Sequence, residues 1–429
     1  MKTKLLILLI TVAVAFSCSQ PPKQISNVSD YEVYLQGSEN EALRLALEDN
    51  TFWKDKLANN PSQFPFEAKL ASSYSNLFGI TGQIEYLIKA EDHLKHVIEV
   101  TEYKTPSYLK SLASNYISQH RFKEALILLT KAELIGDNLE GTQKMLFDVH
   151  LELGNYEMAK MYLDKFISFS DFDYLIRLAK WSDHQGNLEA AIDYMEQAKA
   201  IAEASNLDGI KKWAYTNIAD FYGHAGEIQK SYNHYLKALA LDPNDAYSKK
   251  GIAWIVYSYE KNPKEALRIL DKVMETYHAP DYLLLKAEIA DFEGNDALKH
   301  EQLAQYELEV KNVAYGDMYN KYNVLLYTDE GKHSDETINI AMSEVAHRPT
   351  PQSYDLLAWA YYKNGNLNQA LDIVNNHLAD KTFEPHILYH IAEIYKSAGE
   401  VEKLKPLKKE LLAASYELGP IVSKKISQL

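Results

Sequence analysis

The chain has 429 residues, of which 46% are hydrophobic and 24% are charged. It contains only 17 glycines and 13 prolines, too few for a disordered or loop-rich chain, so we expect a folded and mainly helical protein. The formal net charge is −15. Because binding to phosphate backbones depends on clustered Lys and Arg, this charge argues against nucleic acid as a partner.

The N-terminus has the pattern of a secretory leader. Lys2 and Lys4 precede an almost unbroken apolar run over residues 5–16, which ends just before Cys18. A membrane-spanning helix needs roughly 20 apolar residues, so this run is too short to remain as an anchor. We therefore expect residues 1–17 to be a signal peptide that is removed.

Cys18 is the only cysteine in the sequence. Secreted proteins normally use cysteines in pairs for disulfides, so a single cysteine at the end of a leader indicates a different use. Residues 15–18 resemble a bacterial lipobox, although Ala15-Phe16 departs from the usual Leu-Ala. The resemblance implies that Cys18 carries the lipid that anchors the chain to a membrane. A cleaved leader with an incidental Cys18 is the alternative.

The residues after Cys18 bear on the location of the protein. Two or more acyl chains make anchoring stable. In bacterial lipoproteins, Ser rather than Asp at the position of Ser19 favours the outer membrane. No acidic cluster follows, so this segment does not resemble the export signals of surface lipoproteins. We expect a protein of the cell envelope, lipid-anchored to the outer membrane and facing the periplasm, with surface exposure left open.

Between about residues 67 and 418 one pattern recurs: a helix with small residues on one side, a turn that usually contains Gly, and a second amphipathic helix. A Gly just past a helix end adopts the left-handed conformation that caps it, so each turn is expected to join two antiparallel helices. Successive turns are 32 to 40 residues apart. The ten turns are centred on Gly82, His120, Gly154, Gly186, Gly226, Asn262, Gly294, Gly331, Gly365 and Gly399.

The fifth hairpin has the most regular pattern. Its marked positions are Tyr215, Ile218, Ala219, Tyr222, Gly226, Ile228, Tyr235, Ala238 and Pro243. With a period near 34 residues, the pattern resembles the tetratricopeptide repeat (TPR) family. The first, sixth and eighth hairpins match it poorly. The resemblance implies an all-α fold, an α-solenoid or right-handed superhelix of about ten helix-turn-helix repeats.

The sequence divides into five segments: a signal peptide over residues 1–17, a tether over 18–30, an N-terminal helical cap over 31–66, the TPR solenoid over 67–418, and a C-terminal tail over 419–429. Atypical ends are what a solenoid needs in order to cover its exposed terminal repeats. Together with the leader, this organisation resembles a TPR lipoprotein of the bacterial envelope, of the kind found in Bacteroidota.

Motifs of the common enzyme classes are absent: there is no GxxxxGK[ST] phosphate loop, no HExxH zinc helix and no GxSxG nucleophile elbow. We therefore expect no enzyme activity and no cofactor. His93 and His96 lie three residues apart and could approach one metal ion, but histidines on an exposed helix face are commoner than metal ligands. The pairs Asp183-His184 and Asp220 with His224 are a second metal alternative. We expect no metal site.

In the TPR family, the first helices of successive hairpins line the concave surface. In this register the surface combines aromatic rings with carboxylates, and we predict that it binds a protein segment. The predicted binding residues are Lys180, Asp183, His184, Trp213, Asp220, His224, Tyr247, Trp254, Tyr257, Glu288, Asp291 and Trp359. Exposed aromatic residues are typical anchors of binding surfaces, and the carboxylates favour a basic or amine-bearing ligand. Packing between repeats is the alternative role for the tryptophans.

We therefore expect a non-catalytic scaffold or adaptor whose partner is a protein and which contacts the membrane through its N-terminal lipid. One alternative is a glycan- or nutrient-binding lipoprotein accessory to an outer-membrane uptake system. It would resemble starch-utilisation receptors, but those carry long loops between repeats, and the largest excess here is about six residues, near 205–211. Another alternative is a cofactor that activates a cell-wall or outer-membrane assembly machine.

Overall fold

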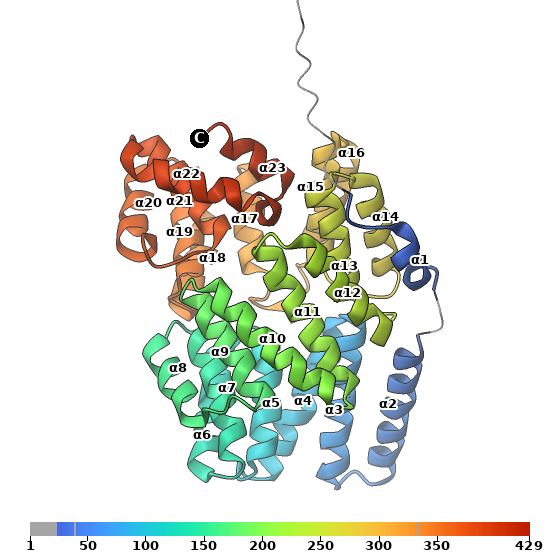
Figure 1. The fold of residues 1–429 in the computed structure, drawn as a ribbon. Coiled ribbons are helices and arrows are strands. Elements are labelled where there is room, and N and C mark those ends of the chain that lie inside the picture. The colour runs from blue at the N-terminus through green and yellow to red at the C-terminus, as the bar shows by residue number, and fades with distance from the viewer. Residues whose placement is uncertain (1–23, 38–39, 333) are drawn as a thin grey trace, which may run out of the picture.

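The computed structural model describes residues 24–37, 40–332 and 334–429, and within these ranges every regular element is a helix (Figure 1). The predicted signal peptide and Cys18 lie outside the described residues. Helices α3 to α22 form ten successive hairpins, from α3/α4 to α21/α22. The predicted all-α solenoid of about ten repeats is thus confirmed.

The helices have the following bounds. They are α1 (Val28–Leu35), α2 (Glu41–Asn59), α3 (Phe64–Thr81), α4 (Ile84–Val100), α5 (Pro106–Ser118), α6 (Phe122–Ile135), α7 (Leu139–Glu152), α8 (Tyr156–Leu163), η1 (Asp164–Phe166), α9 (Phe172–His184), α10 (Leu188–Ala204), α11 (Asp208–His224), α12 (Ile228–Leu241), α13 (Ala246–Trp254), η2 (Ile255–Tyr259), α14 (Pro263–Met274), α15 (Asp281–Glu293), α16 (Asp296–Glu309), η3 (Val313–Tyr315), α17 (Asn320–Glu330), α18 (Ser334–His347), α19 (Pro351–Lys363), α20 (Leu367–Ile373), η4 (Val374–Leu378), α21 (Pro385–Ala398), α22 (Val401–Ala413) and α23 (Ser415–Ile426).

The hairpin turns lie where the spacing predicts them. Gly82, Gly226 and Gly399 follow their helices with φ between +70° and +75°, and each donates its N–H to a carbonyl in the last turn. His120 and Lys261 adopt the same left-handed conformation in the two turns that lack Gly. The antiparallel helices then pack through buried alanines and leucines, so local capping and apolar periodicity together produce each hairpin.

The second turn of the superhelix rests on the first. His278, between α14 and α15, donates its backbone N–H to the carbonyl of Thr81 at 2.7 Å. Lys123, after the second hairpin turn, donates to the carbonyl of Ala346 at 2.8 Å. The turn at Gly186 lies against Phe383. In each case the partners are about six hairpins apart, so the inner face encloses a cavity.

The first described segment does not extend away from the solenoid. Residues 24–30 of the predicted tether and α1 lie along α12 and α14 rather than packing on α2 and α3 (Figure 1). The backbone N–H groups of Ile25 and Ser26 both donate to Glu260 Oε1, at 2.7 and 2.5 Å. Tyr31 donates to Glu265 at 2.8 Å. We call residues 24–37 the N-terminal strap.

Within the predicted N-terminal cap, helix α2 is one continuous helix over 41–59, and it packs on α3. The predicted C-terminal tail is helical from Pro420 to Ile426, after a kink at Gly419 that divides α23. No helix among the described residues has both the length and the apolar character needed to cross a bilayer.

Stacking of successive helices is interrupted at one place between α2 and α23. Helices α16 and α17 make almost no direct contact, whereas every other successive pair in that range packs together. A hydrogen bond of 2.8 Å from the Tyr306 hydroxyl to Asn323 Oδ1 bridges the gap, and Tyr315 and Tyr319 fill part of it. We call this gap the α16–α17 break.

The contact between superhelical turns can be tested at Gly82. Its φ is +70°, and a Cβ there would lie 2.2 Å from the carbonyl oxygen of His278. Gly226 has φ of +73° and open space around it. We expect Gly226→Ala to cost about 1 kcal/mol from left-handed strain alone. Gly82→Ala should cost about 2 kcal/mol more, because backbone must also move. Urea unfolding measures the loss of stability in each variant. Equal losses of stability for Gly82→Ala and Gly226→Ala would contradict the packing of the two superhelical turns.

Candidate functional site

The enclosed inner face forms two connected chambers. The first has a volume of about 1150 Å³ and lies mainly between α5, α7 and α9 on one side and the start of α17 and α19 on the other. The second has a volume of about 1090 Å³ and lies between α13, α15 and α16 on one side and α17, α19, α21 and α23 on the other. Lys321, Tyr322, Gln352 and Glu384 line both chambers and form the waist between them.

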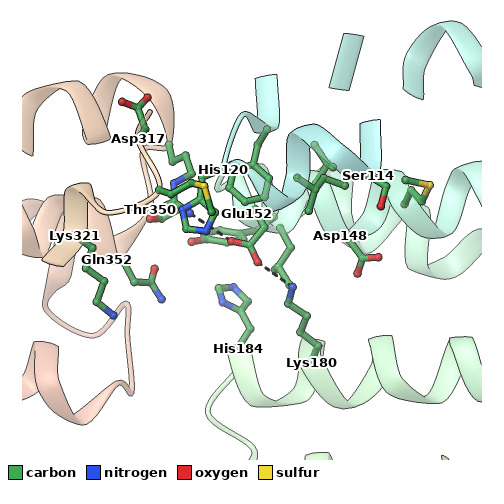
Figure 2. Close-up of a pocket in the computed structure, with 18 of the residues that line it drawn as sticks. Ser114, His120, Asp148, Glu152, Lys180, His184, Asp317, Lys321, Thr350 and Gln352 are labelled. Atoms are coloured by element: carbon green, nitrogen blue, oxygen red, sulfur yellow. Dashed lines mark hydrogen bonds and ion pairs between the residues drawn. The ribbon is translucent and has the colours of Figure 1, made fainter. Parts of the chain in front are cut away.

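An ion-pair network organises the first chamber. Lys180 donates to Glu152 at 2.9 Å (Figure 2). Arg348 from the opposite superhelical turn lies 3.6 Å from the same carboxylate. Burial by itself would raise the pKa of Glu152, but Lys180 and Arg348 hold it below its ordinary value. Lys180 is 45% exposed and yet surrounded by protein, because it faces a chamber rather than the outside.

The cavity is acidic overall. Thirteen carboxylates and eight Lys or Arg side chains line the two chambers, a formal charge of −5. A charge of this sign inside a concave space favours cationic ligands and disfavours anionic ones.

Several polar groups near the waist have no partner. The side chains of Asp183, Lys321, Gln352 and Glu384 make no hydrogen bond or ion pair with any described residue. Figure 2 shows Lys321 and Gln352 projecting from one side and His184 from the other. Burial raises the pKa of Asp183 and of Glu384, since their charged forms lack compensating donors. These groups could be satisfied by water or by a ligand.

Seven of the predicted binding residues line the chambers. Lys180, Asp183 and His184 lie in the first, and the remaining four lie in the second: Trp254, Glu288, Asp291 and Trp359. The indole of Trp359 is only 5% exposed and stacks on His390, with ring centroids 3.9 Å apart. It therefore packs between repeats more than it faces the second chamber.

The other five predicted residues line neither chamber. Tyr257 is fully buried and donates to Glu288 at 3.0 Å. Asp220 accepts hydrogen bonds from Tyr235 and Tyr247, both at 2.5 Å. The ring of Tyr247 is half exposed. Trp213 and His224, the last two of the five, lie on α11 together with Asp220. Trp213 is 40% exposed and meets Phe172 edge-on, while His224 pairs with α23. A binding role for all twelve residues stays a prediction.

Helix α23 covers part of the predicted binding surface. His224 Nδ1 lies 2.8 Å from Glu417 Oε2, and Gly419 lies against Trp254 and Glu288. Burial alone would lower the pKa of His224, but Glu417, with Asp183 and Asp220 nearby, raises it to about 9. The ion pair therefore holds α23 against α11 at neutral pH. Nothing in the repeat pattern predicts this cover, because residues 419–429 follow the last repeat and resemble a tail.

The predicted binding residues do not include the waist residues. Lys321 and Tyr322 lie on α17 and Gln352 on α19, the first helices of hairpins eight and nine, and Glu384 caps the start of α21. The repeat register places Lys321 on the first helix of the poorly matching eighth hairpin, a concave position. That position is the one feature of the sequence that points to a waist residue.

Most of the side chains considered as metal ligands are bound to other side chains. His93 and His96 both contact the carboxylate of Glu67, at 3.0 and 2.5 Å. Asp220 and His224 are held by the tyrosines and by Glu417, as described above. Within the described parts of the chain, no group of three or more His, Cys, Asp or Glu side chains is placed to hold a metal ion.

Residues 214–245, most of α11 and α12, match the family model described as tetratricopeptide repeat. The hairpins on either side repeat the same helix-turn-helix geometry. The chain is a TPR-type repeat protein. A comparison with curated proteins finds no match.

Solved structures show more distant likenesses. A human IFIT1 dimer with PPP-AAAA is 14% identical, covering 81% of this chain and 80% of that one, with a TM-score of 0.46. PilW, a type IV pilus biogenesis factor, is 16% identical, covering 48% and 94%, with a TM-score of 0.39. PilF of Pseudomonas aeruginosa is 15% identical, covering 51% and 97%, with a TM-score of 0.37.

The most perturbed carboxylate of the cavity gives a pH-dependent prediction. Burial, with Asp291 nearby, raises the pKa of Glu288 from 4.5 to about 7. The folded protein therefore binds this proton more tightly than the unfolded chain does, and its stability falls as the pH rises from about 4.5 to 7. Glu288→Gln removes the charge and keeps an acceptor for Tyr257. We expect it to stabilise the protein by on the order of 1 kcal/mol at pH 8.

Urea midpoints at pH 8 and pH 4.5 measure this effect, which should nearly vanish at the lower pH. Glu293→Gln, on the exposed end of the same helix, is the control and should change neither midpoint. A gain of equal size at both pH values would contradict a buried charge at Glu288.

Proposed function

We propose that this TPR-type protein is a non-catalytic adaptor of the cell envelope, anchored by lipid at Cys18, that holds a basic protein segment in its inner cavity. The observation that carries the proposal is the pair of connected chambers with a formal charge of −5 and unpartnered polar groups at their waist. An extended or helical segment bearing Lys or Arg would neutralise these carboxylates and supply donors to Asp183 and Glu384.

A preformed cavity favours binding, because little order has to be created when the segment enters. The walls come from hairpins fixed by buried cores, and the ion pairs of Glu152 with Lys180 and Arg348 hold the two superhelical turns in place. Binding energy is then spent mainly on ordering the ligand.

The N-terminal strap supports the anchored arrangement. Five residues lie between Cys18 and Gln24, and a fully extended chain spans about 20 Å at most over these six residue steps. Since the strap is tied to Glu260 and Glu265, a lipid on Cys18 would hold the α12–α14 side of the solenoid near the membrane. The cavity would then have a fixed orientation relative to the bilayer.

Anchoring is tested by the substitution Cys18→Ser. We expect the variant to lose acyl labelling and to leave the membrane fraction, because the thiol is the acceptor of the first lipid. Membrane fractionation and incorporation of a labelled fatty acid are the measurements. Ser29→Ala, an exposed position on α1, is the control. A Cys18→Ser protein that remains firmly bound to membranes would show that Cys18 is not the anchor.

The ligand class is tested by crosslinking in the native envelope. A photoreactive benzophenone residue at Gln352, which faces both chambers, should capture a protein, whereas the same residue at Leu134, exposed outside the cavity, should not. Mass spectrometry of the adducts identifies the captured segment. Capture of polysaccharide without protein at Gln352 would contradict the adaptor and favour the glycan-binding alternative.

A further inference from the structure

The second chamber of the inner face borders the α16–α17 break, where the stacking of successive helices is interrupted. Elsewhere between α2 and α23, successive helices pack on one another. Here the tyrosine cluster around Tyr306 and Tyr319 fills only part of the gap. Leu284 and Leu326 pack against this cluster on one side, and on the other side α15 and α17 face the second chamber.

These faces are apolar. Leu284 and Leu285 on α15 and Leu325 and Leu326 on α17 line the second chamber and are only partly buried. Such leucines gain from contact with another apolar surface, at about 25 cal/mol per Å² removed from water. A guest element that filled the gap would restore the stacking that the two hairpins lack.

The rim of the same chamber is acidic. Glu288, Asp329, Glu330 and Glu393 line it, and three of its five lysines are already paired with carboxylates. The exceptions are Lys321, at the waist, and Lys425 of α23. A guest that placed Lys or Arg beside its apolar stripe would meet these carboxylates.

Helix α23 already presents that combination to the chamber. Its side chains Ile421, Val422 and Lys425 line one wall. Leu418 and Ile426 are buried in the core shared with α21 and α22, so α23 belongs to the C-terminal hairpins. Its first turn crosses to α11 and η2, where the Ser258 hydroxyl donates to the carbonyl of Tyr416 and Glu417 pairs with His224.

We infer that the α16–α17 break is a docking cleft for an amphipathic helix of a partner protein, with leucines of the cleft against its apolar stripe and carboxylates of the rim against its Lys or Arg residues. The inference rests on the proposed function and names its ligand more closely. Helix α15 has 13 residues and is about 20 Å long, so a guest helix of similar length spans the cleft. The crossing by Tyr416 and Glu417 closes the cleft on one side and limits entry.

The test uses the chain from Ser19 onward, which retains every described residue, made without lipid so that no detergent competes. The probe is a fluorescein-labelled 18-residue peptide of Leu and Lys at helical spacing. Fluorescence anisotropy measures its dissociation constant. One matched peptide replaces Lys by Glu, and another keeps the composition with strictly alternating residues. We expect only the helical Leu/Lys peptide to bind.

Four variants locate the binding. Leu325→Lys, inside the cleft, should weaken binding about tenfold or more, and Asp329→Lys, on the exposed rim, about threefold. Their controls are Leu308→Lys and Glu301→Lys, both exposed on α16 outside the chambers, which should change affinity less than about twofold. Asp329→Lys keeps the test decisive if Leu325→Lys misfolds, because Asp329 is largely exposed.

A further variant tests the closure. Glu417→Ala removes the ion pair to His224 and should tighten binding of the Leu/Lys peptide and speed amide exchange in residues 415–420. Lys424→Ala, exposed on the same helix, should do neither.

Equal binding of the Leu/Lys and Leu/Glu peptides, or unchanged binding by both cleft variants, overturns the inference. A fluorescent fatty acid that binds wild type and not Leu325→Lys, with no peptide binding, assigns the cleft to a lipid chain and also overturns it. Protein capture at Gln352 tests the proposed function separately. If Gln352 captures a protein and the cleft variants do not change peptide binding, the adaptor function is supported and the docking cleft is contradicted.

Discussion

The structure depends on the contact between successive turns of the superhelix. Glycines at hairpin turns supply the left-handed conformation that ends a helix, and at Gly82, Gly154 and Gly186 the missing Cβ also lets a loop about six hairpins away approach. Remaining turn glycines such as Gly226 have open space around them. Because three turns serve both purposes, the solenoid coils back on itself and its concave face becomes a partly enclosed cavity.

This enclosure changes the chemistry of the inner face. On an open TPR groove, Lys180 and Glu152 would be a surface ion pair of small value. Inside the chamber the same pair joins Arg348 from the second turn and links the two coils. Partial desolvation in the cavity also raises the pKa of the Asp183 carboxyl, and that of Glu384 even though this side chain keeps contact with solvent. The acidity of the inner face can be predicted from the composition. The shifted pKa values arise because the superhelical turns partly enclose that face.

The sequence predicts the local features and misses the distant ones. Turn spacing and capping residues are local, so all ten hairpins follow from them. Docking of the strap on Glu260 joins residues more than 230 positions apart, and no periodic pattern encodes it. The same holds for the cover of Trp254 by Gly419. The repeat register assigns Trp359 and Lys180 to the same concave face. It does not show that Trp359 stacks on His390 while Lys180 faces the cavity.

The poorly matching repeats mark where the solenoid departs from regular stacking. The first carries Gly82 at the contact between superhelical turns, and the sixth contains the π-helical η2 beside Glu260, which binds the strap. The eighth begins at the α16–α17 break, where tyrosines replace helix-on-helix packing. Natural sequences depart from local rules where another contact or a function requires it. In this chain, loss of the repeat signature therefore carries information of its own: the break that borders the second chamber is encoded by the residues that fit the TPR pattern least.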